Sequence, residues 1–152
     1  MKKIAALLCG AVMAFSSVCS ATVSADKIAL DQLKPGMKVS EVTSIYGQPT
    51  RKKGDEWTFR RFKIEIDGDN SRIVKEIETR SSSFATPNGV RVGQKATVLN
   101  RAYGVADRRD IEDDEEQHEY YSHDYSRKIE FKVVNGVIVE ISCEYQIEKK
   151  AH

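Results

Sequence analysis

Hydrophobic and polar residues alternate most clearly near the end of the chain. Between residues 137 and 147 every second side chain is apolar and most of those between are polar, the period of a strand that buries one face. Asn135-Gly136, a strong hairpin sequence, precedes this segment and follows a strand-like stretch over residues 120–134. The pattern predicts an antiparallel hairpin with Cys143 on its apolar side.

A helical spacing of apolar residues occurs twice, in two segments of equal length. Residues 36–47 and 93–104 share the pattern Gly-x-Lys-x-Ser/Thr-x-aliphatic-x-x-aliphatic/Ala-Tyr-Gly. Positions i, i+3 and i+4 make one apolar face, so each segment predicts a short amphipathic helix, with Ser40 or Thr97 as N-cap and Gly47 or Gly104 as the stop. The apolar positions are Val42, Ile45 and Tyr46 in the first segment and Leu99, Ala102 and Tyr103 in the second.

Each predicted helix is followed by strand-like sequence. In the first half, residues 57–67 and 72–79 flank turn-forming residues at 67–70. Ser-rich and Pro-Asn-Gly segments between the halves indicate a linker. We therefore predict an α+β fold of two helix-plus-β-hairpin repeats, residues 26–83 and 84–152, forming one compact unit with the helices on one face of an antiparallel sheet.

The first repeated segment resembles a known superfamily. Gly36-Met37, Glu41-Val42 and Tyr46-Gly47-Gln48-Pro49 are similar to the helix-to-strand segment of the SmpA/OmlA and β-lactamase-inhibitor-protein-like superfamily. The resemblance implies a small secreted or periplasmic α+β domain, in several members a tandem one, with helices on one face of an antiparallel sheet. The lipid-anchor cysteine of the outer-membrane assembly lipoproteins has no equivalent here.

The first 25 residues have the charge and hydrophobicity profile of a secretory signal. Lys2 and Lys3 precede an apolar run over residues 4–15, too short to span a bilayer as an anchor. Small residues at Val23-Ser24-Ala25 predict cleavage after Ala25, and Ala21 offers a second site. Leu8 and Val18 precede the two cysteines of this segment, where a lipoprotein signal needs a small residue, so we expect a free, unlipidated periplasmic or secreted protein.

Composition narrows the class of protein further. The chain of 152 residues has 24 Lys and Arg against 23 Asp and Glu, and removal of the signal leaves it slightly acidic, which argues against a nucleic-acid binder. We expect no membrane span. Only Cys143 remains after cleavage, so no internal disulfide is expected. No histidine lies near it in sequence and its side is apolar, which favours a core residue over a catalytic nucleophile.

Two segments resemble metal sites but depart from the required spacing. Asp67, Asp69, Ser71 and Glu78 match a calcium loop, yet Arg72 stands where that loop needs Gly, which favours a polar turn. The histidines at 118 and 123 are five residues apart rather than four, so neither a helix nor a strand points both at one metal. We expect no metal site and no cofactor.

Two groups of residues remain as candidate binding elements. The first is an acidic insertion over residues 107–119, interpreted as a mobile loop or, alternatively, as a contact for a basic partner or for calcium. The second is a set of aromatic residues on strands near loops, some of which could anchor a partner on the open sheet face. The acidic candidates are Asp110, Glu112, Asp113, Asp114, Glu115 and Glu116, and the aromatic ones are Trp57, Phe59, Tyr120, Tyr121 and Tyr125.

Three functional hypotheses follow from these features. The first is a non-catalytic module that binds an envelope or extracellular protein, as an inhibitor or assembly factor. The second is a small envelope hydrolase or metal-dependent enzyme, which needs a cleft where a histidine meets a carboxylate or Cys143. The third is a calcium- or ligand-responsive protein acting through the acidic segment. The absence of phosphate loops, nucleophile elbows and Cys-x-x-Cys pairs favours the first.

Overall fold

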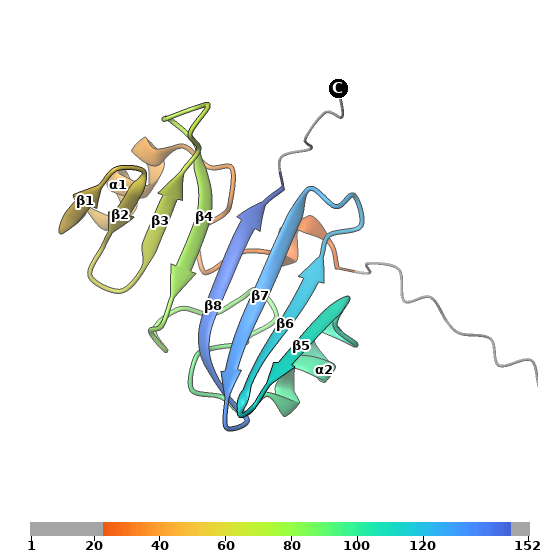
Figure 1. Ribbon diagram of the computed structural model, residues 1–152. Helices are drawn as coiled ribbons and strands as arrows, with labels where there is room; N and C mark the ends of the chain where they lie inside the picture. Colours follow the sequence, from red (N-terminus) through yellow and green to blue (C-terminus); the bar gives the residue numbers. More distant parts are fainter. Residues whose placement is uncertain (1–22, 147–152) are drawn as a thin grey trace, which may run out of the picture.

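A single antiparallel sheet of eight strands dominates the structure, with two short helices on one of its faces (Figure 1). The computed structural model describes residues 23–146. The strand order is β1-β2-β3-β4-β8-β7-β6-β5. The predicted α+β class is confirmed. The elements are η1 (Ala25–Lys27), α1 (Val39–Tyr46), β1 (Arg51–Lys53), β2 (Glu56–Thr58), β3 (Lys63–Ile66), β4 (Val74–Thr79), α2 (Thr97–Tyr103), β5 (Arg108–Glu112), β6 (Glu115–Tyr121), β7 (Arg127–Val134) and β8 (Val137–Tyr145).

Each helix is followed by four strands, not by the two that the sequence predicted. The segment 57–67 was expected to be one strand but turns back on itself after β2, where the Phe59 N–H donates to the Phe62 carbonyl at 2.8 Å. Both rings are buried and stack with centroids 4.5 Å apart, so the turn is held by core packing. Aromatic residues favour a strand locally, and only their burial together decides that the chain reverses here.

The acidic segment 107–119 is also ordered, which corrects its interpretation as a mobile loop. It forms most of the β5–β6 hairpin, with Ile111 opposite Glu116 and Glu112 opposite Glu115. β6 also pairs along its length with β7. Backbone pairing and salt bridges outweigh the repulsion that the run of like charges suggested. The first half also has a hairpin, β1–β2, directly after its helix.

Both predicted hairpin turns are present. Asn135 and Gly136 have φ of 50° and 75°, the positive values that a two-residue turn between β7 and β8 requires. Between β3 and β4 the Asp67 carboxylate accepts the backbone N–H of Asp69 at 2.8 Å, as in an Asx turn. Its oxygen therefore serves the turn, as the polar-turn interpretation predicted.

The predicted N-caps are wrong by one or two residues. The residue at the N-cap of α1 is Lys38, whose N–H donates to the Glu41 carboxylate at 2.8 Å, and that of α2 is Ala96. Lys38 and Lys95 form β-bridges with Ile73 and Val137, so extended chain runs up to each helix. Ser40 and Thr97 consequently fall inside the helices.

The two repeated segments make matching contacts with the last strand of their own half. In the first, Gly36 N–H donates to the Val74 carbonyl at 2.7 Å and Val74 N–H donates to the Met37 carbonyl at 2.9 Å. In the second, Gly93 N–H donates to the Ile138 carbonyl at 2.8 Å and Ile138 N–H donates to the Gln94 carbonyl at 2.9 Å. That these segments are copies of one ancestral repeat stays a prediction.

The core lies between the helices and the sheet. Val42 and Leu99 anchor the two helices in it, while Ile45, predicted to be apolar and buried, is 43 % exposed because the short α1 turns it away from the sheet. One aromatic cluster lies under each helix: Tyr46, Phe59, Phe62 and Phe84 under α1, and Tyr103, Tyr120 and Phe131 under α2. Within residues 23–146 no helix is long and apolar enough to span a membrane.

Candidate protein-binding face

The face of the sheet opposite the helices, here called the open face, is made of charged side chains. Alternation along each strand sends the apolar residues to the core and these residues to the other side. Acids outnumber bases on it. The acids are Glu56, Glu65, Glu76, Glu78, Glu115, Glu119, Glu130, Glu140 and Glu144, the bases are Lys63, Lys75, Arg80, Lys128 and Lys132, and the two edge strands add Arg51, Lys53, Arg108, Asp110 and Glu112.

Four carboxylates lie in register across the open face: Glu56 on β2 is opposite Glu65, and Glu65, Glu76 and Glu144 continue the row to its centre. Glu76 on β4 is directly opposite Glu65 on β3 and Glu144 on β8. Lys75 Nζ contacts Glu65 at 3.0 Å and Glu144 at 3.9 Å, and Lys128 Nζ contacts Glu144 at 3.6 Å. Glu76 itself makes no hydrogen bond or ion pair with a described residue. Like charges directly opposite one another in a sheet repel, so this row stores unfavourable energy.

The environment of Glu76 changes its ionisation. Burial between neighbouring strands, together with the negative charges of Glu144 and Glu65, raises the pKa of the Glu76 carboxyl to about 7. Burial likewise raises the pKa of Glu130. A cation brought to this row by a partner would stabilise the ionised form of Glu76.

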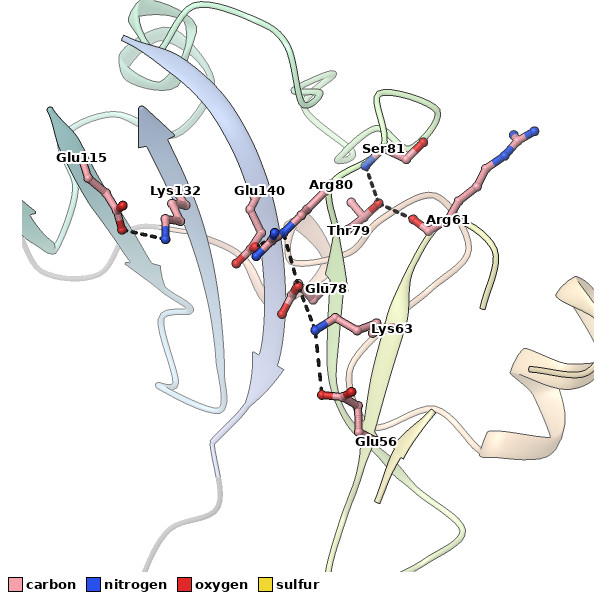
Figure 2. A network of polar contacts seen from close by, with 10 residues as sticks. All are labelled: Glu56, Arg61, Lys63, Glu78, Thr79, Arg80, Ser81, Glu115, Lys132 and Glu140. Carbon is pink, nitrogen blue, oxygen red and sulfur yellow. Dashed lines mark hydrogen bonds and ion pairs between the residues drawn. The ribbon is translucent and has the colours of Figure 1, made fainter. Parts of the chain in front are cut away.

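A chain of ion pairs crosses the open face beside this row (Figure 2). Lys63 Nζ contacts Glu56 at 3.8 Å and Glu78 at 3.2 Å, and Arg80 Nε contacts Glu140 at 2.6 Å. These pairs cross from β2 to β8 and thereby join strands from both halves of the chain. The charges here are compensated, in contrast to that of Glu76.

The five aromatic candidates do not form one patch. Phe59 and Tyr120 are buried in the core, so their side chains are not available to a partner. Trp57 lies on the helix side of β2, opposite Ile64, with Lys52 Nζ 3.8 Å from the centre of its ring.

Only Tyr121 and Tyr125 lie together at the surface. Their ring centroids are 6.0 Å apart, and Tyr125 is 59 % exposed. Tyr121 shares the row of Lys128, Glu144 and Glu76 on the open face, and its hydroxyl donates to Glu119 at 2.9 Å. The pair therefore forms an aromatic border to the acidic row.

The candidate acidic residues divide between the two sides of the β5–β6 hairpin. Asp110, Glu112 and Glu115 belong to the open face, and Asp113 and Asp114 form the tip. Glu116 points to the helix side, where Arg109 Nε and Nη2 donate to one of its oxygens at 3.0 and 2.7 Å. This arginine, with His118 at 2.8 Å, lowers the pKa of Glu116.

Cys143 lies in the core, as predicted, and burial raises its thiol pKa well above the usual range. The histidines do not share a ligand site: His118 is on β6 and His123 lies in the β6–β7 turn. Among residues 23–146 no cluster of three or more His, Cys, Asp or Glu side chains is arranged to hold a metal ion.

A cavity of about 430 Å³ opens on the helix side between α2 and the β5–β6 hairpin. Its walls combine Leu99, Val105 and Ala106 with the polar side chains of Arg109, Glu116 and His118. Sequence reasoning did not find this cavity. Its residues come from three segments whose proximity depends on how α2 crosses the sheet.

Solved structures share this fold. A DUF4309 family protein, YjgB, from Bacillus subtilis matches with a TM-score of 0.52 and 14 % identity over 72 % of this chain and 78 % of that one. An extracellular protein containing a SCP domain from Bacillus anthracis matches with a TM-score of 0.50 and 7 % identity over 82 % of this chain, but this chain spans only 46 % of that protein. At such identities the likeness establishes the fold alone.

A proposed β-lactamase inhibitor protein from Streptococcus mutans matches with 15 % identity over 84 % of this chain and 93 % of that one. Its TM-score of 0.30 is too low to support an argument. No family model and no curated protein matches the chain. The resemblance to the SmpA/OmlA group stays a prediction.

Proposed function

We propose that this protein is an exported, non-catalytic module that binds a protein partner on the open face of its sheet. The observation that supports this most is the row of Glu65, Glu76 and Glu144, in which Glu76 forms no ion pair with a described residue and has a raised pKa. An arginine or lysine of a partner placed over this row would relieve the repulsion. The partner surface we infer is therefore basic.

The tyrosine pair supports the same surface. Tyr121 and Tyr125 border the acidic row, and tyrosines at an interface bury a large area at a small cost in side-chain entropy. Charged rows guide association and determine which partners are accepted, whereas aromatic anchors supply much of the affinity. The open face combines both.

The enzyme hypothesis has one feature in its favour. His118 Nε2 lies 2.8 Å from a Glu116 carboxylate oxygen at the cavity beside α2, as that hypothesis requires. However, Arg109 donates to the same oxygen, and the lowered pKa keeps Glu116 ionised, unlike a general acid. Cys143 is buried and its pKa is raised, so it is a poor nucleophile. This arrangement favours binding over catalysis.

Affinity purification from the native envelope after cross-linking tests the proposal. The protein should recover a partner with a basic surface, and Glu76→Arg should abolish this recovery because it reverses the charge at the centre of the row. Asp55→Arg makes the same charge change in the exposed β1–β2 turn and serves as the matched control. Undiminished recovery by Glu76→Arg would exclude the open face as the binding surface.

The calcium-responsive hypothesis stays a separate prediction. Calorimetric titration of the purified protein with calcium tests it directly. Heat that disappears when Asp113 and Asp114 are changed to Asn would favour it over the binding module.

A further inference from the structure

The outer side of the edge strand β5 pairs with no other strand among residues 23–146. Strand β5 pairs with β6 on its other side and is the last strand in the sheet order. All five of its residues, Arg108–Glu112, are exposed. An edge strand presents unpaired backbone N–H and C=O groups on its outer side, which another extended chain can pair with.

Apolar surface lies beside this edge on the helix side. Ile111 is 61 % exposed and Val105 is 67 % exposed, two of the most exposed large hydrophobic side chains among residues 23–146. Val105 lines the cavity between α2 and the hairpin, and Ile111 is directly opposite Glu116, which lines it too. Apolar side chains next to a free edge match a partner strand that buries its own apolar side chains there.

The ionisable side chains of Arg109, Glu116 and His118 in this cavity contact one another. Arg109 and His118 both contact the Glu116 carboxylate, at 2.7 and 2.8 Å. The Glu116 charge is thus compensated within the wall, which lowers the free-energy cost of covering it with an apolar side chain of a partner. The cavity of about 430 Å³ is large enough for such a side chain.

The opposite side of β5 is acidic. Asp110 and Glu112 point to the open face, and the tip of the hairpin adds Asp113 and Asp114. Arg108 pairs with Asp110 at 2.9 Å, but Glu112 has no ion pair within the described residues. A strand added to β5 therefore meets negative charge on one face and apolar surface on the other.

From this arrangement we propose that β5 is the docking edge for an extended segment of a partner protein in which basic and apolar residues alternate. The segment adds to the sheet beside β5. Its basic side chains lie next to Asp110 and Glu112, and its apolar side chains cover Ile111 and enter the cavity beside α2. This surface is separate from the centre of the open face and does not depend on the function proposed above.

A second copy of this chain fits the edge less well. The other free edge of the sheet is β1, whose residues Arg51, Lys52 and Lys53 are all basic. Strand β1 thus has the positive charge that would match Asp110 and Glu112, but it has no apolar side chain to cover Ile111 or to enter the cavity. Lysines on an edge are also a common means of preventing edge-to-edge association.

Fluorescence anisotropy with a labelled peptide of alternating lysine and valine tests the proposal. The expected result is saturable binding to the purified protein, weakened at least about tenfold by Ile111→Lys. Ile45→Lys is the matched control, since Ile45 is an exposed isoleucine on α1, and it should bind as the unaltered protein does. A peptide of the same composition, with all lysines before all valines, should bind at least about tenfold more weakly.

The proposal would be overturned if both peptides bound with equal affinity or if Ile111→Lys bound the alternating peptide as tightly as the unaltered protein does. It would also be overturned if Ile45→Lys lost as much affinity for this peptide as Ile111→Lys. Dimerisation of the protein alone as its concentration rises is the other outcome to measure. If Ile111→Lys abolishes such dimerisation, the segment that docks on β5 belongs to a second copy of this chain and not to a partner protein. Val105→Ser provides an independent variant, and circular dichroism of each variant establishes that it is folded. If Ile111→Lys is unfolded, binding by Val105→Ser at full strength overturns the proposal.

Discussion

Glu76 lies directly opposite Glu144 where β4 pairs with β8, the strand pair that joins the two halves of the sheet. Two carboxylates in register across this pair repel each other, and burial adds to the cost of ionising Glu76. The strand pair that holds the molecule together thus carries a destabilising charge. Such a cost at a central position is typical of a functional surface rather than of a purely structural one.

Stability is expected to fall as the pH rises through the range in which Glu76 ionises. Its pKa is about 7 in the folded protein and 4.5 when unperturbed, so between these values the folded state binds more protons than the unfolded state. Glu76→Gln, which stays neutral, should raise the free energy of unfolding at pH 8 by about 1–2 kcal/mol after allowance for solvent screening, and change it little at pH 4.5. Urea denaturation at several pH values measures this.

Glu56→Gln is the control for this pH dependence. Glu56 is at the outer end of the same row, opposite Glu65, but its side chain is 54 % exposed. It should leave the pH profile unaltered. A Glu76→Gln protein that is no more stable than the unaltered protein at pH 8 would contradict the raised pKa.

Cys143 should be unreactive toward thiol reagents in the folded protein. Its side chain is fully buried and its pKa is raised, so little thiolate forms and none is accessible. Ser142→Cys places a second thiol on the neighbouring, half-buried position of β8 that faces the other side of the sheet. In the exported protein, the variant should take up a single label when folded and two in denaturant, by mass spectrometry. Rapid labelling of Cys143 without denaturant would mean that the core opens readily.

The contacts of residues 23–25 favour the alternative cleavage site, after Ala21, over the one predicted after Ala25, so we expect an exported protein to begin at Thr22. Val23 is buried and its carbonyl accepts the His123 N–H at 2.9 Å, and the Ala25 carbonyl accepts Arg127 Nη1 at 3.2 Å. Cleavage after Ala25 would remove these contacts. Of the predicted signal, residues 1–25, the first 22 residues lie outside the described residues.

Intact mass of the exported protein identifies this end of the chain. A version beginning at Asp26 should be less stable than one beginning at Thr22 by at least about 2 kcal/mol in denaturant titrations, because it no longer buries Val23. Equal stability of the two versions would show that Val23 contributes nothing to folding.

The helix-stop glycines should not tolerate a side chain. Gly47 has φ 82° and ψ −168°, and Gly104 has φ 78° and ψ −154°, a region that glycine alone adopts readily. An added Cβ would meet no atom at either position, so the cost of Ala is backbone strain of about 1–3 kcal/mol. Gly68→Ala, in the β3–β4 turn and without positive φ, is the control and should cost little. Thermal unfolding distinguishes the two outcomes.

Local patterns predicted the parts of the fold that depend on neighbouring residues. The glycine stops, the Asn135-Gly136 turn and the apolar side of Cys143 all followed from spacing alone. The end of β2 near Phe59 and the ordered hairpin over residues 107–119 could not be predicted from spacing alone. In both places the local composition is compatible with another structure, and pairing with distant strands decides between them.

The sequence predicted some residues of the candidate site but not their arrangement. Sequence placed tyrosines and acids near the right strands, and Tyr121 and Tyr125 do lie together at the surface. The predicted set also included Phe59 and Tyr120, which are buried in the core. The sequence of a strand does not distinguish a buried aromatic residue from an exposed one. The row of Glu65, Glu76 and Glu144 was missed, since alternation shows that each faces away from the core but not that the three are adjacent.

The sequence alone determined the two helices, the fold class and the side of the last strand on which Cys143 faces the core, because these depend on periods of two and 3.6 residues along the chain. The tertiary structure alone decided which strands are neighbours, and with them the carboxylate row across β3, β4 and β8, the free edge of β5 and the cavity beside α2. Those features join residues far apart in sequence, and their pairing depends on the packing of both halves against one shared core.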